Sequence, residues 1–259
     1  MPFNEAQTMA VQHGKGPMMV LAGPGSGKTT VIVGRVRNLV ENLKVSPSSI
    51  LVITFTRAAA REMEERYLAL EQENSSGRVS FGTFHSVFFR ILKLAYRYSG
   101  ENIVREEQQT EFLRREIARL SLEVEDEGEF IRTVLGEISE VKGEMISLEH
   151  YYAKSCSGEI FKQLYEAYER SLRQLNLLDF DDMLTMCYEL FRERKDILSA
   201  WQRKYPYILI DEFQDINRIQ YEVVKLMALP GNNLFIVGDD DQSIYRFRGA
   251  RPELMLGFF

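Results

Sequence analysis

The segment from Ala22 to Thr29 constrains this chain more than any other, because it reads Ala-Gly-Pro-Gly-Ser-Gly-Lys-Thr. The short apolar run Met18 to Leu21 precedes it and is typical of a strand, and the residues from Lys28 onward have the apolar spacing of a helix. The glycines therefore fall at a turn between a strand and a helix. That context, rather than the glycines alone, predicts a loop that binds phosphate groups.

The residue types of this loop indicate how it would hold a nucleotide. Its glycines allow the backbone to turn amide groups inward around an anion, at the positive end of the following helix. We expect the Lys28 ammonium to reach the β- and γ-phosphates and the Thr29 hydroxyl to coordinate Mg²⁺. Ala22 stands where the strict motif has a glycine. The predicted nucleotide-binding residues of this segment are Ala22, Gly23, Pro24, Gly25, Ser26, Gly27, Lys28, Thr29 and Thr30.

A second segment, Ile208 to Asp215, places two carboxylates at the end of an apolar strand. Alone, an acidic pair is more often the solvated start of a helix. Here, burial of two carboxylates at the tip of a strand is costly without a cation, which favours a metal site. We expect Asp211 to hold Mg²⁺ together with Thr29, and Glu212 to act as the general base that activates water. ATP and Mg²⁺ are therefore the predicted ligands. The predicted catalytic residues are Lys28, Glu212 and, from a later segment, Gln242.

Charge is spread unevenly along the 259 residues. The net charge is -6, but residues 101–150 hold 14 acidic and 6 basic residues, which leaves a net charge of +2 on the rest. Any surface that binds a polyanion must therefore be local. The two cysteines, Cys156 and Cys187, are too few for a disulfide framework or a zinc site, and no apolar run reaches the roughly 18 residues of a membrane span. We expect a cytoplasmic monomer without a membrane segment.

The order of strand and helix patterns predicts an α/β fold that a helical insertion interrupts. Strand and helix patterns alternate at both ends of the chain, which argues for a parallel sheet, whereas helical patterns alone fill the middle. The apolar end of the chain, 252–259, indicates a fragment of a longer protein. The expected boundaries are 1–88 and 199–259 for the α/β domain and 89–198 for the insertion. The expected strands are 18–21, 50–54, 78–81, 207–210 and 234–237.

Hydroxyl, aromatic and basic side chains follow the second and third predicted strands, and aromatic and basic residues alternate again from Tyr245 to Arg248. Proteins bind single-stranded nucleic acid with such groups, because hydroxyl and basic side chains contact the phosphates and aromatic side chains stack on the nucleobases. The alternative is that Phe55 and Phe84 belong to the core and that Thr83 caps a helix. Gln242 could sense a γ-phosphate or orient water. The candidate DNA-binding residues are Phe55, Thr56, Arg57, Thr83, His85, Tyr245, Phe247 and Arg248.

Seven motifs in a fixed order cover the chain from end to end: FNEAQ, AGPGSGKT, TFTRAAAREMEER, GTFHS, LDFDDML, ILIDEFQD and VGDDDQSIYRFRGA. This order resembles the UvrD/Rep/PcrA family of superfamily 1 DNA helicases. The resemblance implies a RecA-like P-loop NTPase domain, subdomain 1A, with the insertion as subdomain 1B. It also implies that Gln7 contacts the adenine edge, that Gln242 couples the γ-phosphate to DNA, and that the protein moves 3′ to 5′ on single-stranded DNA. A second RecA-like domain, missing from this chain, would supply arginines to the γ-phosphate.

The sequence departs from the family pattern at three positions: Arg57-Ala58 stands where Asn-Lys is frequent, Thr30 where an arginine is common, and Phe247 where the family has tryptophan. Without the second domain, the fragment should hydrolyse ATP weakly and be inactive as a helicase. Two alternatives remain open: the helicase part of an AddA- or RecB-like helicase-nuclease, and a nucleotide-gated DNA-binding module that does not unwind. Glu212 argues against the module, because a switch needs no general base.

Overall fold

The computed structural model describes residues 3–23, 25–70 and 77–239. The chain divides into two compact units, which we call the α/β unit (Met1–Val87 and Tyr188–Phe259) and the helical unit (Phe88–Cys187). A search of the described residues found no helix that is long and apolar enough to cross a membrane.

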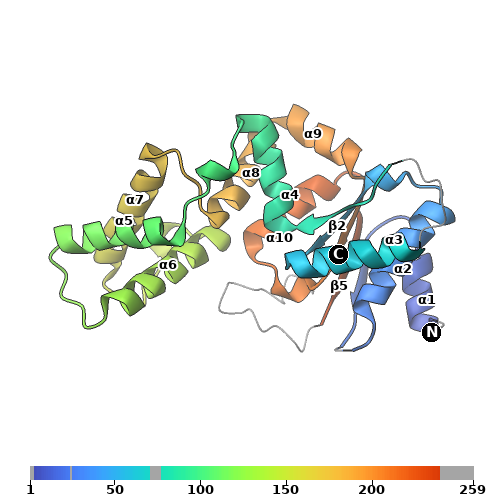
Figure 1. Cartoon of the computed structure of the whole chain (residues 1–259), viewed down its shortest axis with the longest axis horizontal. Helices are drawn as coiled ribbons and strands as arrows, with labels where there is room; N and C mark the ends of the chain where they lie inside the picture. Colours follow the sequence, from blue (N-terminus) through green and yellow to red (C-terminus); the bar gives the residue numbers. More distant parts are fainter. Residues whose placement is uncertain (1–2, 24, 71–76, 240–259) are drawn as a thin grey trace. The chain divides into compact units, whose positions relative to one another are not determined.

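Figure 1 shows the sheet of the α/β unit, with β2 and β5 labelled. Within the described residues, its five parallel strands have the order β1-β5-β4-β2-β3. This sheet confirms the predicted α/β class. Every position of β2 is buried, which explains its continuous apolar sequence, because a central parallel strand is covered on both faces. The strands are β1 Met18–Leu21, β2 Ile50–Thr54, β3 Ser80–Thr83, β4 Tyr207–Ile210 and β5 Asn233–Gly238.

Helices pack on this sheet and fix the position of its strands. α2 contacts β5, α3 contacts β2 and β3, and α9 contacts α10 and the short helix η1. The expected insertion is 89–198, and the compact helical unit is Phe88–Cys187, so α9 belongs to the α/β unit, where it contacts α10 and η1. The helices of this unit are α1 Glu5–Gln12, α2 Lys28–Glu41, α3 Arg57–Leu70, α9 Lys195–Lys204 and α10 Arg218–Ala228, with the 3₁₀ helices η1 Pro47–Ser49 and η4 Phe213–Asp215.

The helical unit encloses an apolar core of its own, formed by residues of α5, α6 and α7. Asp126 and Ser157 cap α6 and α7, since each side chain accepts a hydrogen bond from a backbone amide in the first turn. The chain enters this unit within α4 and leaves it within α8. The helices are α4 Phe84–Tyr96, α5 Glu106–Arg119, α6 Glu127–Gly143, α7 Gly158–Gln174 and α8 Phe180–Glu193, with the 3₁₀ helices η2 Gly100–Asn102 and η3 Leu148–His150.

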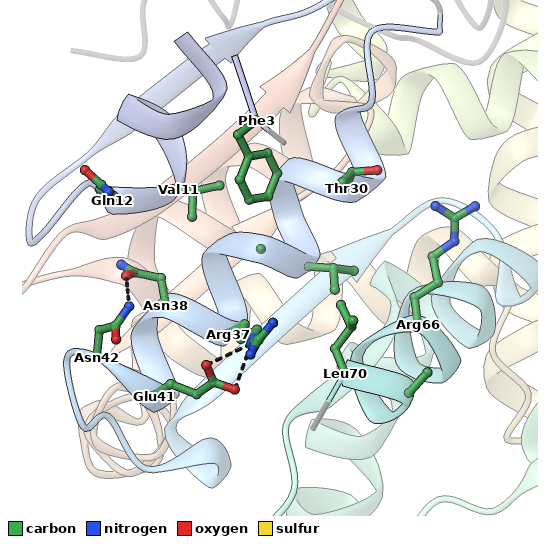
Figure 2. A pocket seen from close by; sticks show the side chains of 13 residues that line it. Phe3, Val11, Gln12, Thr30, Arg37, Asn38, Glu41, Asn42, Arg66 and Leu70 are labelled. Carbon is green, nitrogen blue, oxygen red and sulfur yellow. Dashed lines mark hydrogen bonds and ion pairs between the residues drawn. The ribbon is translucent and has the colours of Figure 1, made fainter. Parts of the chain in front are cut away.

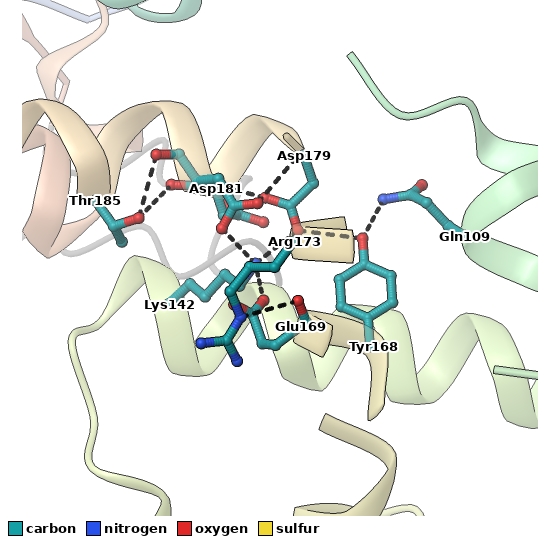
Figure 3. A network of polar contacts seen from close by, with 9 residues as sticks. Gln109, Lys142, Tyr168, Glu169, Arg173, Asp179, Asp181 and Thr185 are labelled. Carbon is teal, nitrogen blue, oxygen red and sulfur yellow. Dashed lines mark hydrogen bonds and ion pairs between the residues drawn. The ribbon is translucent and has the colours of Figure 1, made fainter. Parts of the chain in front are cut away.

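A buried lysine lies at the centre of a polar network in the helical unit (Figure 3). The Nζ of Lys142 is 2.6 Å from a carboxylate oxygen of Glu169, 2.8 Å from one of Asp179 and 2.7 Å from one of Asp182. The Tyr168 hydroxyl donates a hydrogen bond of 3.1 Å to Asp179. Burial alone would lower the pKa of Lys142, but the carboxylates, Asp179 foremost, hold that pKa well above its ordinary value. The charged lysine therefore joins α6, α7 and the start of α8.

The sheet topology points to the carboxyl ends of β2 and β4 as the place for a ligand. In the strand order, β3 lies next to β2 in one direction and β5 lies next to β4 in the other, so the connections that follow β2 and β4 run towards opposite edges of the sheet. Open α/β sheets bind ligands where neighbouring connections diverge in this way. Ile53 pairs with Ile210 in the parallel register, so Thr54 and Asp211 follow at the same level. The predicted acidic pair therefore emerges at the favoured edge of the sheet.

Candidate nucleotide-binding site

The phosphate loop joins β1 to α2 and has the backbone conformation that its glycines permit. Gly25 and Gly27 have φ angles of 68° and 86°, which lie in the left-handed region that disfavours other residues. Gly27 is the N-cap residue of α2. The Ser26 hydroxyl donates a hydrogen bond of 2.6 Å to the Gly23 carbonyl, which closes the loop on itself. The glycine conformations and this hydrogen bond shape the turn that leads into the amino end of α2, the part of a helix that favours anions. Pro24 lies outside the described residues.

Asp211 follows β4 and is almost completely buried. Its amide donates a hydrogen bond of 2.9 Å to the Ile53 carbonyl, which extends the pairing of β4 with β2 by one residue. Burial and the charge of Glu212 raise the pKa of Asp211 to about 6, although Lys28 and a hydrogen bond from Thr54 act in the opposite direction. The carboxylate is therefore ionised at neutral pH in surroundings that disfavour its charge.

The Asp211 carboxylate also fits a cation. Its Oδ1 atom is buried and has no hydrogen-bond partner among the described residues. A buried, ionised oxygen without a partner is costly, and Mg²⁺ prefers oxygen ligands of this kind. Thr29, the second predicted metal residue, is half-buried in the first turn of α2. The donor set therefore suits Mg²⁺.

Glu212 contacts the lysine of the phosphate loop. The Lys28 ammonium lies 2.8 Å from Glu212 Oε2, and the two side chains are 13% and 34% exposed. Glu212 has a φ of 51°, a left-handed conformation that is uncommon for a residue with a side chain and that is often found at functional sites. Two of the predicted catalytic residues, Lys28 and Glu212, are thus brought together, although 184 positions separate them in the sequence.

Gln214 is a site residue that sequence reasoning missed. Its amide nitrogen donates a hydrogen bond of 2.7 Å to Glu212 Oε2, and its amide oxygen accepts one of 3.0 Å from the Asp239 amide. The side chain therefore connects the end of β4 to the end of β5 and orients the Glu212 carboxylate. The available signal was its place in the ILIDEFQD motif, where a buried glutamine beside carboxylates needs a polar partner.

Gln7 lies against the phosphate loop. Asn4 caps α1, because its side chain accepts a hydrogen bond of 2.8 Å from the Gln7 amide. In return, Gln7 Oε1 accepts one of 3.0 Å from the Asn4 amide. Gln7 Nε2 donates a third, of 2.9 Å, to the Ser26 carbonyl. The side chain that the family resemblance assigns to adenine is thus held between a helix N-terminus and the loop.

A mainly apolar groove of about 640 Å³ runs along α2, between the N-terminal residues and the end of α3 (Figure 2). The Phe3 ring covers Gly34, where an added Cβ would lie 2.6 Å from the Cζ atom of Phe3. Gly34 therefore allows the close approach of the N-terminal segment to α2. Thr30, a predicted nucleotide contact, is exposed and lines this groove.

The predicted DNA contacts of the second strand lie at the start of α3. The Thr56 hydroxyl accepts a hydrogen bond of 3.1 Å from the Ala59 amide, and Arg57 is exposed. Phe55 is half-buried and meets the ring of the buried Phe84 edge-on, with 5.8 Å between the ring centroids. Thr56 and Arg57 are therefore the exposed members of this group.

The contacts predicted after the third strand are more enclosed. Thr83 is buried and exchanges hydrogen bonds with Ser86: its hydroxyl accepts from the Ser86 amide at 3.2 Å, and its own amide donates to the Ser86 hydroxyl at 2.8 Å. This is the helix-capping arrangement weighed as the alternative. His85 is half-buried. The remaining predicted residues lie outside the described part of the chain: Gln242, Tyr245, Phe247 and Arg248.

Comparison with known proteins gives a consistent result over nearly the whole chain. A sequence model of the family described as UvrD/REP helicase N-terminal domain matches residues 3–259. The ATP-dependent DNA helicase PcrA of Leuconostoc citreum is 38% identical over 266 residues, which are 99% of this chain and 35% of that protein. PcrA of Bacillus subtilis is 37% identical over 99% of this chain and 35% of its own length. The ATP-dependent DNA helicase Rep of Escherichia coli is 35% identical over 98% of this chain and 38% of its own length. The chain thus spans about a third of the length of the curated relatives that it matches.

Proposed function

The chain belongs to the UvrD/REP helicase N-terminal domain family, and from that premise we propose that it is the ATP-binding motor domain of a DNA helicase. In this proposal it moves 3′ to 5′ along single-stranded DNA by ATP hydrolysis, as a cytoplasmic monomer. The α/β unit serves as subdomain 1A and the helical unit as subdomain 1B. A second RecA-like domain supplies the arginines that act on the γ-phosphate, and such arginines contribute roughly 10³ to 10⁵ in rate.

The contact between Lys28 and Glu212 supports this proposal most directly. The phosphates of ATP compete with Glu212 for the Lys28 ammonium, because both are anions that the same cation can bind at 2.8 Å or near it. Once released, Glu212 accepts a proton from the water that attacks the γ-phosphorus. Gln214 keeps the Glu212 carboxylate in place during this exchange, through the hydrogen bond that it donates to the same oxygen.

Thr29 and Asp211 would hold Mg²⁺ in this site. When bound, the ion neutralises charge on the β- and γ-phosphate oxygens. Asp211 suits this task because it is ionised above a pKa of about 6 and because its buried Oδ1 lacks another partner among the described residues. The charge that is costly in the folded chain becomes favourable beside a cation.

We place the single-stranded DNA across the carboxyl ends of β2 and β3. Arg57 contacts the phosphate backbone, and Phe55 and His85 offer aromatic faces for the bases. From the sequence, Tyr245 and Phe247 extend this track. The α/β unit holds 19 basic and 18 acidic residues, a net charge of +1, so unlike the acidic helical unit it does not repel a polyanion on average.

A substitution of Glu212 by glutamine tests the mechanism. Glu212→Gln should lower the rate of ATP hydrolysis by roughly 10²- to 10⁴-fold, the usual contribution of a general base, and change the affinity for Mg-ATP only a few-fold. The matched control is Glu65→Gln, an exposed glutamate on α3. Phosphate release and calorimetric titration would be measured on both variants. Loss of binding would make Glu212 a structural or metal residue, and unchanged hydrolysis would refute its role as base.

A further inference from the structure

One side chain joins the N-terminus of α1 to the phosphate loop. Gln7 Oε1 accepts the Asn4 amide at 3.0 Å, and Gln7 Nε2 donates to the Ser26 carbonyl at 2.9 Å. The contact with the loop is close, since a Cβ built on Gly27 would lie 3.3 Å from Gln7 Nε2. A residue assigned only to a nucleobase would have no need of the Ser26 carbonyl.

The hydrogen bond to Ser26 fixes the orientation of a peptide group in the loop. In a planar trans peptide the carbonyl and the next amide point in opposite directions. Gln7 holds the Ser26 carbonyl towards α1, so the amide of Gly27 points away from α1. Gly27 has a φ of 86°. Because glycine can adopt several backbone conformations of similar energy, a contact from another residue is needed to select this one. Gln7 supplies that contact.

The amide of Gln7 retains the capacity to bind a base at the same time. A glutamine side chain has two donor hydrogens and two acceptor lone pairs. Asn4 and Ser26 use one of each, which leaves one donor and one acceptor of the amide without a partner among the residues that the structure describes. The major-groove edge of adenine offers one acceptor and one donor, whereas the same edge of guanine offers two acceptors. The free half of the amide therefore complements adenine.

We propose that Gln7 is a positioning residue for the phosphate loop as well as the contact for adenine. It holds the Ser26–Gly27 peptide in the orientation that binds phosphate, so that base and phosphates are bound cooperatively through one side chain. This inference rests on the proposed nucleotide binding. It predicts that a loss of the Gln7 amide weakens a phosphate ligand that has no base at all.

Inorganic tripolyphosphate with Mg²⁺ is the probe that separates the two roles. Calorimetric titration of the whole chain would compare Mg-tripolyphosphate, Mg-ATP and Mg-GTP on the wild type and on Gln7→Met. The variant keeps the size of the side chain and removes its hydrogen bonds. Tripolyphosphate affinity should fall about threefold to tenfold, as for one lost hydrogen bond, and the preference for ATP over GTP should fall as well. Ser157→Ala, which removes a helix cap in the helical unit, should change none of these affinities.

A second variant distinguishes the loss of the contact with Ser26 from an unfolding of α1. Gln7→Glu keeps the acceptor that caps the helix but cannot donate to the Ser26 carbonyl. Its tripolyphosphate affinity should also fall, by more than that of Gln12→Glu, which adds the same charge on α1. If the wild type bound neither ATP nor tripolyphosphate, the proposed function itself would fail. If the wild type bound both and the Gln7 variants bound tripolyphosphate equally well, Gln7 would be only a base contact or a helix cap.

Discussion

Each unit of this molecule contains a lysine that meets carboxylates at ion-pair distance, and the two lysines differ in what surrounds them. Lys142, in the helical unit, has a side chain only 4% exposed and contacts three carboxylates. Lys28, in the α/β unit, is 13% exposed and pairs with Glu212, which is itself 34% exposed. A buried lysine whose ammonium contacts three carboxylates has no position left for a ligand. A lysine that shares one partly exposed carboxylate can exchange that partner for a phosphate.

Three carboxylates surround the single ammonium group of Lys142 and fix its position. Oxygens of Glu169, Asp179 and Asp182 lie within 4.8 Å of one another, an arrangement that could hold a metal ion, yet the Lys142 Nζ contacts all three. Burial and the charge of Asp179 raise the pKa of Asp182 to about 7, although Lys142 acts in the opposite direction. The lysine therefore serves as the cation of this site and connects helices, as Figure 3 shows.

The largest expected difference between the two lysines is in folding stability. Lys142→Met should lower the free energy of unfolding of the helical unit by about 3–5 kcal/mol, because removal of one partner leaves buried carboxylates without compensation. Lys28→Met should lower the stability of its own unit by less than about 1 kcal/mol, because its carboxylate partner can turn to water. Urea unfolding followed by circular dichroism would measure both. Equal losses would remove the distinction between a fixed and an exchangeable lysine.

A smaller effect concerns pH at the nucleotide site. The pKa of Asp211 is raised to about 6 in the folded chain, above the ordinary aspartate value, so its contribution to stability is greatest below pH 4 and is lost as pH rises through 6. Metal binding has the opposite dependence, because Mg²⁺ needs the ionised carboxylate. The affinity for Mg-ADP should fall roughly tenfold from pH 7 to pH 5. Asp211→Asn should bind more weakly and lose this additional pH dependence, whereas an identical pH profile in the variant would exclude Asp211 as a ligand.

Local sequence predicts the buried strands well and the less regular elements poorly. The bounds of β1, β2 and β4 match the prediction, because buried parallel strands are continuous apolar runs between turn residues. β3 was expected at 78–81 but pairs with β2 over Ser80–Thr83, since the register of the partner strand, not local composition, decides where it ends. α9 was not predicted, because its short amphipathic pattern follows α8 almost directly.

The polar sites show the same contrast between features that local sequence indicates and features that depend on tertiary packing. Lys28 and Glu212 could be singled out from the sequence because each lies within a short motif whose residue types indicate its chemistry locally. The Lys142 cluster could not, because its partners come from α7 and from the segment that begins α8, and only tertiary packing brings them together. The contact of Gln7 with Ser26 was missed for the same reason: it joins segments 19 positions apart that local patterns treat separately.

The most direct test of the exchangeable lysine is a calorimetric titration of Mg-ATP into the wild-type chain and into Lys28→Met, with the thermal unfolding midpoint of each recorded in the same buffer. The account predicts that the wild type binds ATP at one site, and that the variant unfolds at nearly the same temperature but shows no binding. If Lys28→Met bound Mg-ATP with the affinity of the wild type, Lys28 would be a structural lysine like Lys142, and the assignment of Ala22 to Thr29 as the phosphate loop would be contradicted.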